Sequence, residues 1–315
     1  MSSLICGKHV TEANRDTIAS MTPSPILRSL PLVGWAGPFA APTCDSAVAT
    51  LEAGKILFLP QLAFAIPPDE ADLLDPAVSA AGRKNVSFDA ATGEIGNVAL
   101  DARDAARLKA LLIRFAEQSA ALARALLPRY RSALEIGRTS FRPVEIAGRE
   151  YSPRHDDRRL HVDAFPSRPL RGKRILRLFA NVAPDGAERA WRVGEPFADF
   201  AGKLAPGIAP PFPGSAWLLA QSRITKGRRS AYDHVMLQLH NCAKLDDQYQ
   251  RGAPRRDLRF PPGSVWLCFT DQVLHAALSG HAALEQTFYL PVDALAEPAT
   301  SPLRVLEKLL GRPLV

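Results

Sequence analysis

FPPGSVWLCFTDQVLHAALSGHAALEQTFYLP, residues 260–291, is the stretch that decides the fold. Pro262 and Gly263 predict a turn, and the apolar residues 265–269 that follow them predict a strand. His275 comes after a short loop, and residues 284–291 predict a returning strand. A turn, a strand, a histidine and a returning strand are the order in which a double-stranded β-helix presents its distal metal ligand. We therefore expect this fold, with His275 as a ligand.

From residue 139 onward, the chain consists of short apolar or alternating runs that are divided by proline and glycine. Runs of this length at these intervals are typical of an antiparallel sandwich or barrel. The predicted strands are residues 139–146, 174–182, 215–219, 264–269 and 284–291. One interruption, residues 232–245, has apolar side chains at helical spacing and predicts a helix. The predicted fold class is mainly β with flanking helices around a jelly-roll, cupin-like core.

The flanks of this core are predicted to be more helical. Residues 56–62 predict a strand, and an acidic first turn with a glycine stop predicts a helix at 69–82. Apolar residues at three- and four-residue steps predict a longer helix at 101–127. Near the end of the chain, Ser301 is a predicted N-cap, Pro302 the first helical position and Gly311 the stop.

At 315 residues the chain can bury a full hydrophobic core, and its 27 prolines favour loops and strand ends over a helical bundle. We interpret residues 1–315 as a single domain. Its predicted parts are an N-terminal helical and loop elaboration (1–136), the double-stranded β-helix core (137–292) and a C-terminal helix (301–311).

The formal charge of +7 comes mostly from arginines in residues 154–177, 223–229 and 251–259. Arginine forks suit carboxylates and phosphates, so an anionic partner is one interpretation and a solubilising surface is the other. Aromatic residues make up 7% of the chain and are not interleaved with the basic runs. This pattern disfavours a nucleic-acid partner.

The cellular compartment is predicted from the cysteines and the N-terminus. Cys6, Cys44, Cys242 and Cys268 show no CxxC spacing, which indicates free thiols in a reducing compartment. The first residues lack the basic start and apolar run of a signal peptide, so we expect a cytoplasmic protein. The apolar stretch 26–42 is broken by proline and glycine and is expected to be a loop packed on the domain; contact with a membrane or partner is the alternative.

The sequence RLHVDAFPSRP, residues 159–169, contains a candidate metal-binding pair. His161 and Asp163 lie two residues apart at a predicted strand end, so both side chains project to one face. An imidazole and a carboxylate suit a divalent metal, and a histidine from a facing strand would complete a facial triad. His275 is our predicted third ligand. His240, on the predicted helix, and His281, in a predicted turn, are the competitors for that role.

The sequence blocks around these residues resemble the Kdo 3-hydroxylases, a family of Fe(II)/2-oxoglutarate-dependent dioxygenases. The resemblance runs from about residue 137 to 292. It is carried by GRTSFRPVE (137–145), DDRRLHVDAFPSRP (156–169), RILRLFANVAPDG (174–186), RAWRVGEPF (189–197), YDHVMLQLHN (232–241), DQVLHAALSG (271–280) and LEQTFYLP (284–291). These blocks together are far more specific than a single HxD motif.

The resemblance implies an enzyme that holds Fe(II) on His161, Asp163 and His275. It further implies 2-oxoglutarate as cosubstrate, O2 as oxidant and Kdo attached to lipid A as acceptor, with hydroxylation at C3 of the sugar. Without the resemblance, two other functions remain open. One is a cupin-like metalloprotein with different chemistry, and the other is a non-catalytic module that binds an anionic glycan.

The cosubstrate site departs from the usual pattern. Many relatives carry an arginine or lysine ten or eleven residues after the distal histidine, where this chain has Glu285 and Gln286. We therefore expect Arg142 to bind the far carboxylate of 2-oxoglutarate, with Arg177 as second choice. Asn181, which shares a strand face with Arg177, and Gln286 are predicted to donate hydrogen bonds to the cosubstrate.

The remaining basic residues suggest how the acceptor is bound. Arg168, Arg171 and Arg174, near the HxD motif, are predicted to hold the carboxylate of the sugar acid. Basic residues contribute about 1 kcal/mol each near an anionic leaflet, so we expect peripheral contact with the inner membrane. Trp191 and Trp217 are predicted to be core or strand residues and not sugar platforms.

Overall fold

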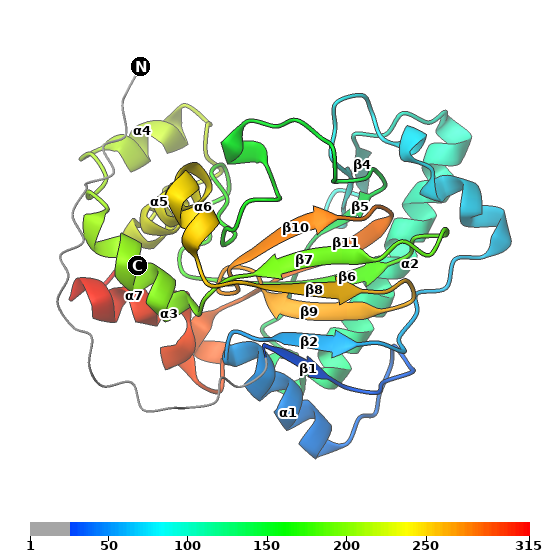
Figure 1. Ribbon diagram of the computed structural model, residues 1–315, viewed down its shortest axis with the longest axis horizontal. Coiled ribbons are helices and arrows are strands. Elements are labelled where there is room, and N and C mark those ends of the chain that lie inside the picture. The colour runs from blue at the N-terminus through cyan, green and yellow to red at the C-terminus, as the bar shows by residue number, and fades with distance from the viewer. Residues whose placement is uncertain (1–25) are drawn as a thin grey trace.

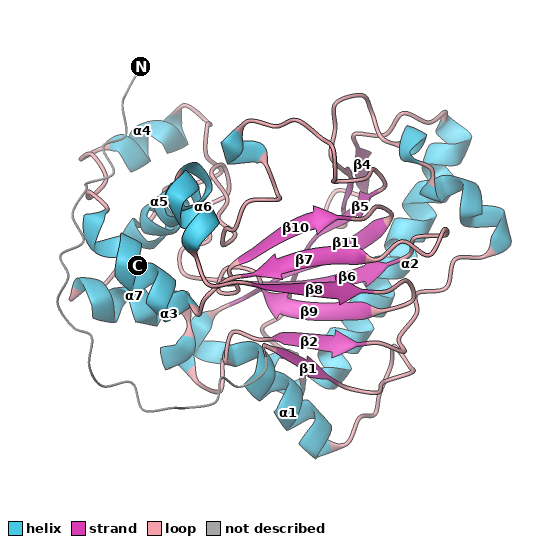
Figure 2. Cartoon of the chain, viewed as in Figure 1, coloured by secondary structure: helices cyan, strands magenta, loops and turns pink. Residues whose placement is uncertain are grey.

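Two β-sheets form the centre of the computed structural model, which describes residues 26–315 (Figures 1 and 2). All strand pairs are antiparallel except β1 with β2. The larger sheet has, in spatial order, β1 (Leu27–Ser29), β2 (Ile56–Leu59), β9 (Val265–Phe269), β6 (Arg174–Asn181), β11 (Ala283–Leu290), β5 (Glu135–Arg142), β3 (Val86–Asp89) and β4 (Glu94–Gly96). The smaller sheet has β10 (His275–Ser279), β7 (Arg189–Val193) and β8 (Arg256–Phe260). The predicted β-sandwich of jelly-roll type is confirmed.

The outer face of the larger sheet packs against helix α2 (Ala102–Leu126), which lies behind the sheet in Figure 1. Asp101 caps this helix by accepting a hydrogen bond from Asp104 N at 2.9 Å. Successive side chains of β11 point to opposite faces, so Leu284 joins the core beneath α2 while Glu285 points into a cavity between the sheets. This alternation decides which residues can reach the site.

A stack of aromatic side chains fills the space between the sheets. Trp266 of β9 lies between Phe260, with ring centroids 4.1 Å apart, and Phe179, at 5.3 Å. Trp191 of β7 packs edge-on against Trp266 and stacks on the imidazole of His275 at 5.1 Å. Each such aromatic pair adds about 0.5–1.5 kcal/mol beyond the burial of its surface. The stack therefore fixes the position of His275 at the edge of the core.

Most of the remaining helices lie together at one end of the sheets (Figure 1). They are α3 (Phe197–Leu204), α4 (Ser215–Gln221), α5 (Ala231–Leu245), α6 (Asp247–Gly252) and α7 (Pro302–Leu310), while α1 (Ala41–Glu52) packs beside β2. A capping box between Ser230 and Asp233 starts α5. Since α5 crosses the open end of the sandwich, it supplies a wall of the cavity.

Several predicted elements are confirmed. The strands at 174–182, 264–269 and 284–291 correspond to β6, β9 and β11, and the helices at 101–127 and 232–245 correspond to α2 and α5. Two others differ only in their ends, because the strand predicted at 56–62 stops at Leu59 and the one predicted at 139–146 is β5. The C-terminal helix starts and ends as predicted, with Ser301 as its N-cap and Gly311 in the left-handed conformation at φ 64°.

Two predicted elements are wrong. The helix predicted at 69–82 is a pair of short 3-10 segments, Pro68–Leu74 and Pro76–Val78, because Pro76 holds Asp75 in an extended conformation with ψ 138°. The strand predicted at 215–219 is helix α4, since a short apolar run does not by itself distinguish a helix from a strand. Trp217, predicted to be a core or strand residue, is 51% exposed on α4, whereas Trp191 is buried as predicted.

The sheet crosses the boundary that we predicted at residue 137. Strands β1 to β4 all come from residues before it, so the N-terminal part is not only helices and loops. Residues 27–29, within the apolar stretch 26–42, form the edge strand β1. The interpretation as a single domain stays a prediction.

Cys44, Cys242 and Cys268 form no disulfide with one another; Cys6 and the predicted absence of a signal peptide lie outside the described residues. None of the helices within residues 26–315 combines the length and apolar character needed to cross a bilayer.

Candidate metal centre and its cavity

The three predicted metal ligands come together at the open end of the sandwich. The HxD segment pairs with the first residue of β10, because His161 N donates to His275 O and His275 N donates to His161 O, both at 2.9 Å. One ligand atom from each of His161, Asp163 and His275 lies within 4.8 Å of the others, and all three side chains are buried. A single metal ion can therefore contact all three.

Backbone hydrogen bonds set the tautomer of both imidazoles. Nδ1 of His161 lies 2.8 Å from Arg159 O, and Nδ1 of His275 lies 2.8 Å from Val273 O. A carbonyl oxygen only accepts, so each Nδ1 carries the proton and each Nε2 keeps a lone pair for a metal. Burial lowers the pKa of both rings, and the neighbouring His275 lowers that of His161 further. Both histidines are thus neutral and ready to coordinate.

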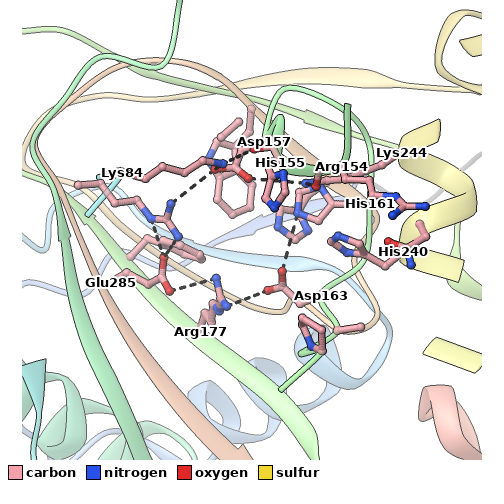
Figure 3. Close-up of a pocket in the computed structure, with 18 of the residues that line it drawn as sticks. Lys84, Arg154, His155, Asp157, His161, Asp163, Arg177, His240, Lys244 and Glu285 are labelled. Carbon is pink, nitrogen blue, oxygen red and sulfur yellow. Dashed lines mark hydrogen bonds and ion pairs between the residues drawn. The ribbon is translucent and has the colours of Figure 1, made fainter. Parts of the chain in front are cut away.

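The two oxygens of Asp163 have different neighbours (Figure 3). Oδ1 lies 3.8 Å from Nε2 of His161, and Oδ2 lies 3.3 Å from Nη2 of Arg177. Burial alone would raise the pKa of Asp163, but the Arg177 guanidinium and the neighbouring histidines together more than offset this, and the pKa is lowered. The carboxylate is therefore ionised, with one oxygen facing the histidines and the other facing a cation.

The donor set fits a divalent transition metal. Two imidazoles and one carboxylate on one side of an ion form the facial triad of non-haem Fe(II) sites, which leaves positions open for other ligands. His240 of α5 lines the cavity with its ring 5.1 Å from that of His161, but its Nδ1 contacts Val162 O. His281 faces Asp185 and Glu145 instead. Neither competitor belongs to the triad.

The triad opens into a cavity of about 520 Å³ between the two sheets and α5. This volume lies in the range of small-molecule sites. Its lining includes six basic side chains (Lys84, Arg142, Arg154, Arg177, Arg189 and Lys244) and three acidic ones (Asp157, Asp163 and Glu285). The positive excess indicates that anions are bound here.

Both arginines predicted to bind the cosubstrate line the cavity, but each already pairs with Glu285. Nη2 of Arg142 lies 2.9 Å from Oε2 of Glu285, and Nη1 of Arg177 lies 3.0 Å from Oε1. Burial alone would raise the pKa of Glu285, but the two guanidinium groups lower it. Figure 3 shows the resulting chain from Glu285 through Arg177 to Asp163.

Arg189 is a cavity residue that we did not predict. It is 4% exposed on β7, and its Nη1 donates to Gly280 O at 2.8 Å. Within residues 26–315 no carboxylate forms an ion pair with it. Burial, together with the nearby Arg142, lowers the pKa of Arg189 to about 9. In RAWRV (189–193), every second residue, that is Arg189, Trp191 and Val193, lies on the same face of β7. This period-2 pattern is the sequence feature from which an inward-pointing arginine could have been predicted.

A second group that we did not predict lies around Asp157, which also lines the cavity. Lys84 Nζ lies 2.9 Å from Oδ2 of Asp157, and Lys244 Nζ of α5 lies 3.6 Å from its Oδ1. Lys244 is 2% exposed, and burial lowers its pKa. No residue spacing predicts this cluster, because Lys84, Asp157 and Lys244 come from three distant segments of the chain.

Asn181 and Gln286, which we predicted to contact the cosubstrate, do not line the cavity. The side-chain amide of Asn181 donates to Ala187 O and Phe260 O, both at 2.9 Å, and so fixes the end of β6. Gln286 is fully buried on the opposite face of β11 from Glu285, where it accepts a hydrogen bond from Thr139 at 2.6 Å. The hydrogen bonds of both side chains stabilise the fold.

The three arginines predicted to hold the sugar acid also lie elsewhere. Arg174 is fully buried, with its Nε 2.7 Å from Oδ2 of Asp271 and its guanidinium over the Phe269 ring. Arg168 contacts the hydroxyl of Tyr289 at 3.4 Å, and Arg171 is exposed in a turn with φ 53°. None of the three lines the cavity, so their role in holding the sugar acid stays a prediction that this geometry does not support.

Comparisons with known proteins agree with this site. A family model described as 3-deoxy-D-manno-oct-2-ulosonic acid (Kdo) hydroxylase matches residues 36–313. The chain is also similar to solved structures of the Kdo hydroxylase KdoO, described as a non-haem Fe(II) α-ketoglutarate-dependent dioxygenase.

The similarity to KdoO covers nearly the whole of both proteins. The complex with α-ketoglutarate and Fe(III) is 47% identical over 92% of this chain and 97% of that chain, with a TM-score of 0.88. The complex with cobalt(II) is 47% identical over 92% and 98%, with a TM-score of 0.90. The apo form is 47% identical over 92% and 97%, with a TM-score of 0.89. Among curated proteins no match was found.

Proposed function

The chain belongs to the Kdo hydroxylase family of non-haem Fe(II)/2-oxoglutarate-dependent dioxygenases, and we propose that it hydroxylates C3 of a Kdo sugar in the inner core of lipopolysaccharide, attached to lipid A. The observation that carries this proposal is the buried triad of His161, Asp163 and His275 at the base of a basic cavity. Bound to these residues, Fe(II) would activate O2 with 2-oxoglutarate as the cosubstrate. This chemistry would replace a C–H bond of the acceptor with C–OH.

The protein's own residues bind and orient the metal, the cosubstrate and the acceptor, and they exclude water from the site. Nε2 of His161, Nε2 of His275 and Oδ1 of Asp163 are the proposed metal-binding atoms, because the other polar atom of each side chain faces Arg159 O, Val273 O or Arg177. Trp191, stacked on His275, keeps that imidazole in place and closes the site toward the core.

We assign the far carboxylate of 2-oxoglutarate to Arg189. Arg142 and Arg177 form ion pairs with Glu285 and Asp163, whereas no described carboxylate forms an ion pair with the buried Arg189, on which Glu145, Glu285 and Asp157 act only from farther away. An uncompensated buried charge is costly, so an anion that enters the cavity gains the most at this position. Arg142 and Arg177 then act mainly by holding Glu285 and Asp163 in place.

The carboxylate of Kdo is assigned to Lys244 and Arg154, which also line the cavity. Lys244 Nζ is buried, with Arg154 O at 3.3 Å and Asp157 at 3.6 Å as its contacts. These are weak contacts for a buried ammonium, so a substrate carboxylate is its natural further partner. The two anions would thus bind to different cations of the same cavity.

We further propose that the enzyme works in the cytoplasm, in peripheral contact with the anionic surface of the inner membrane. Support comes from the formal charge of +7 and from the lipid-borne acceptor that the family implies. A cupin-like metalloprotein with different chemistry would bind the metal without turning over 2-oxoglutarate. A non-catalytic glycan-binding module would leave the acceptor unchanged.

The proposal is tested by mass spectrometry of Kdo-containing lipid A after incubation with the enzyme, Fe(II), ascorbate and 2-oxoglutarate. We expect the acceptor to gain one oxygen while succinate is released. His161→Ala, Asp163→Ala and His275→Ala should each abolish both, whereas His281→Ala, which removes a histidine outside the triad, should not. Succinate release that survives all three triad replacements would refute the metal site, and an unmodified acceptor would refute the substrate.

A further inference from the structure

The segment around α4 exposes more apolar surface than any other part of the described chain of similar length. Nine large hydrophobic side chains within residues 26–315 are exposed, and four of them lie between residues 212 and 224. They are Phe212 (83% exposed), Trp217 (51%), Leu218 (60%) and Ile224 (60%). We call these four residues the apolar patch.

Helix α4 has no packing role that explains this composition. Its sequence SAWLLAQ is mostly apolar, yet none of its residues is buried. A helix of seven residues is not stable on its own in water, because its nucleation cost is shared by too few hydrogen bonds. Figure 1 shows α4 at the periphery of the helical end, beyond α5 and away from the sheets. An apolar helix in this position indicates that something outside the described chain covers it.

The same segment is purely basic. No aspartate or glutamate occurs between Asp199 and Asp233, and the bases within or directly after the apolar patch are Arg223, Lys226, Arg228 and Arg229. Three of these four are exposed, and Arg229 is half-buried. Exposed aromatic and aliphatic side chains beside exposed bases are the features of segments that lie in the interface of an anionic membrane.

The basic residues beside the patch contact a segment that lines the cavity. Lys226 N donates to Ser167 O at 2.8 Å, and the side chain of Arg229 donates to Pro166 O. Pro166 lines the cavity, as do residues of α5, the helix that directly follows the basic run. A surface bound at the patch would therefore lie beside the site that accepts the sugar.

We infer that residues 212–229 form the membrane-docking surface of the enzyme, with the apolar patch inserted among the headgroups of an anionic bilayer and the adjacent bases contacting its phosphates. The inference rests on the proposed function, because it explains how a cytoplasmic enzyme reaches an acceptor that stays anchored in lipid. A second copy of the chain fits this surface poorly. Two-fold contact would place the same bases opposite one another without a compensating acid.

The experiment is co-sedimentation with vesicles that contain phosphatidylglycerol, compared with vesicles of phosphatidylcholine alone. We expect the full-length protein to bind the anionic vesicles preferentially. Phe212→Ser/Leu218→Ser should weaken binding at least ten-fold, and the matched control Val33→Ser/Leu309→Ser, which removes two exposed apolar side chains elsewhere, should leave it unchanged. Arg223→Gln/Lys226→Gln/Arg228→Gln should weaken binding about 100-fold at low salt, while Arg251→Gln/Arg255→Gln/Arg256→Gln, with the same loss of charge, should have a smaller effect.

Turnover of a water-soluble Kdo acceptor, which should be equal in all these variants, separates docking from catalysis. Vesicle binding without any hydroxylation would support the docking surface and refute the proposed function. The docking surface would be overturned if wild-type protein ignores anionic vesicles, if the patch variants bind like wild type, or if the Val33/Leu309 control loses binding. It would also be overturned if the patch substitutions convert a dimer into a monomer in gel filtration.

Discussion

Arg177 Nη2 lies 3.3 Å from Oδ2 of Asp163, so the only carboxylate of the candidate triad is held by a buried cation. The other nitrogen of the same guanidinium, Nη1, lies 3.0 Å from Glu285. Arg177 thus connects Asp163 of the metal site to Glu285, which lines the cavity. This contact lowers the pKa of Asp163 and orients its free oxygen toward the histidines.

Replacing this cation should weaken the metal site without removing a ligand. In Arg177→Gln, Asp163 loses its counter-charge and a contact that fixes its orientation, and losses of this kind cost about 10- to 100-fold in metal affinity. Titration with Co(II), followed by its visible absorption, measures the change. Arg138→Gln on β5, which removes an exposed ion pair with Asp89 of β3, is the control. Equal Co(II) affinity in both variants would show that Arg177 does not support Asp163.

Arg189→Met should weaken the binding of 2-oxoglutarate. A charge-assisted contact of about 1.5–3 kcal/mol corresponds to a loss of roughly one to two orders of magnitude in affinity. The unliganded variant should unfold at an equal or higher urea concentration than wild type, since a buried charge without a carboxylate partner is removed. Isothermal titration with 2-oxoglutarate tests the first part and urea denaturation the second.

Arg192→Met is the matched control for this prediction. Arg192 lies on the same strand but pairs with Asp257 at the surface, at 2.8 Å. Its replacement should leave cosubstrate affinity unchanged. If Arg189→Met binds 2-oxoglutarate as wild type does, the far carboxylate lies at another residue.

The triad could be predicted from the sequence because its signals are local. Two residues of HxD share a face by strand alternation, and the turn and strand before His275 place it opposite them. The arginines could not be ranked in this way. Which of Arg142, Arg177 and Arg189 lacks a carboxylate depends on the register of β5, β6 and β11 and on the facing strand β7.

Two residues that we predicted to bind ligands, Arg174 and Gln286, lie away from the cavity for different physical reasons. Arg174 belongs to a basic run that predicts exposed side chains. It is nevertheless fully buried, because it pairs with Asp271, almost one hundred residues later in the chain. Gln286 and Glu285 differ by one position on β11, and that single step moves a side chain from the cavity to the face beneath α2. Long-range pairing of charges leaves no local pattern in one sequence.

Glu285 should contribute to stability in a pH-dependent way. Its pKa is lowered in the folded protein, so its contribution is fully present above the unfolded value of about 4.3 and is lost as the pH falls toward the folded value. Glu285→Gln leaves Arg142 and Arg177 without their shared carboxylate and should cost about 3–5 kcal/mol at neutral pH. Urea denaturation should show that the difference between wild type and variant is constant from pH 6 to 7 and shrinks below about pH 4. A difference that does not change with pH would mean that Glu285 is not ionised in the folded state.

Lys244→Met should affect the acceptor and not the cosubstrate. Lys244 Nζ is buried in α5, and no partner lies closer than the carbonyl of Arg154 at 3.3 Å. If this ammonium binds the carboxylate of Kdo, its loss removes a charge-assisted contact and should raise the KM for a water-soluble Kdo acceptor about 10- to 100-fold. The KM for 2-oxoglutarate should change less than two-fold, because Arg189 is untouched. Lys109→Met on α2, outside the cavity, is the control, and Co(II) binding verifies that the triad next to Lys244 is intact. The opposite result, a raised KM for 2-oxoglutarate with an unchanged KM for the acceptor, would refute this assignment. It would place the cosubstrate carboxylate at Lys244.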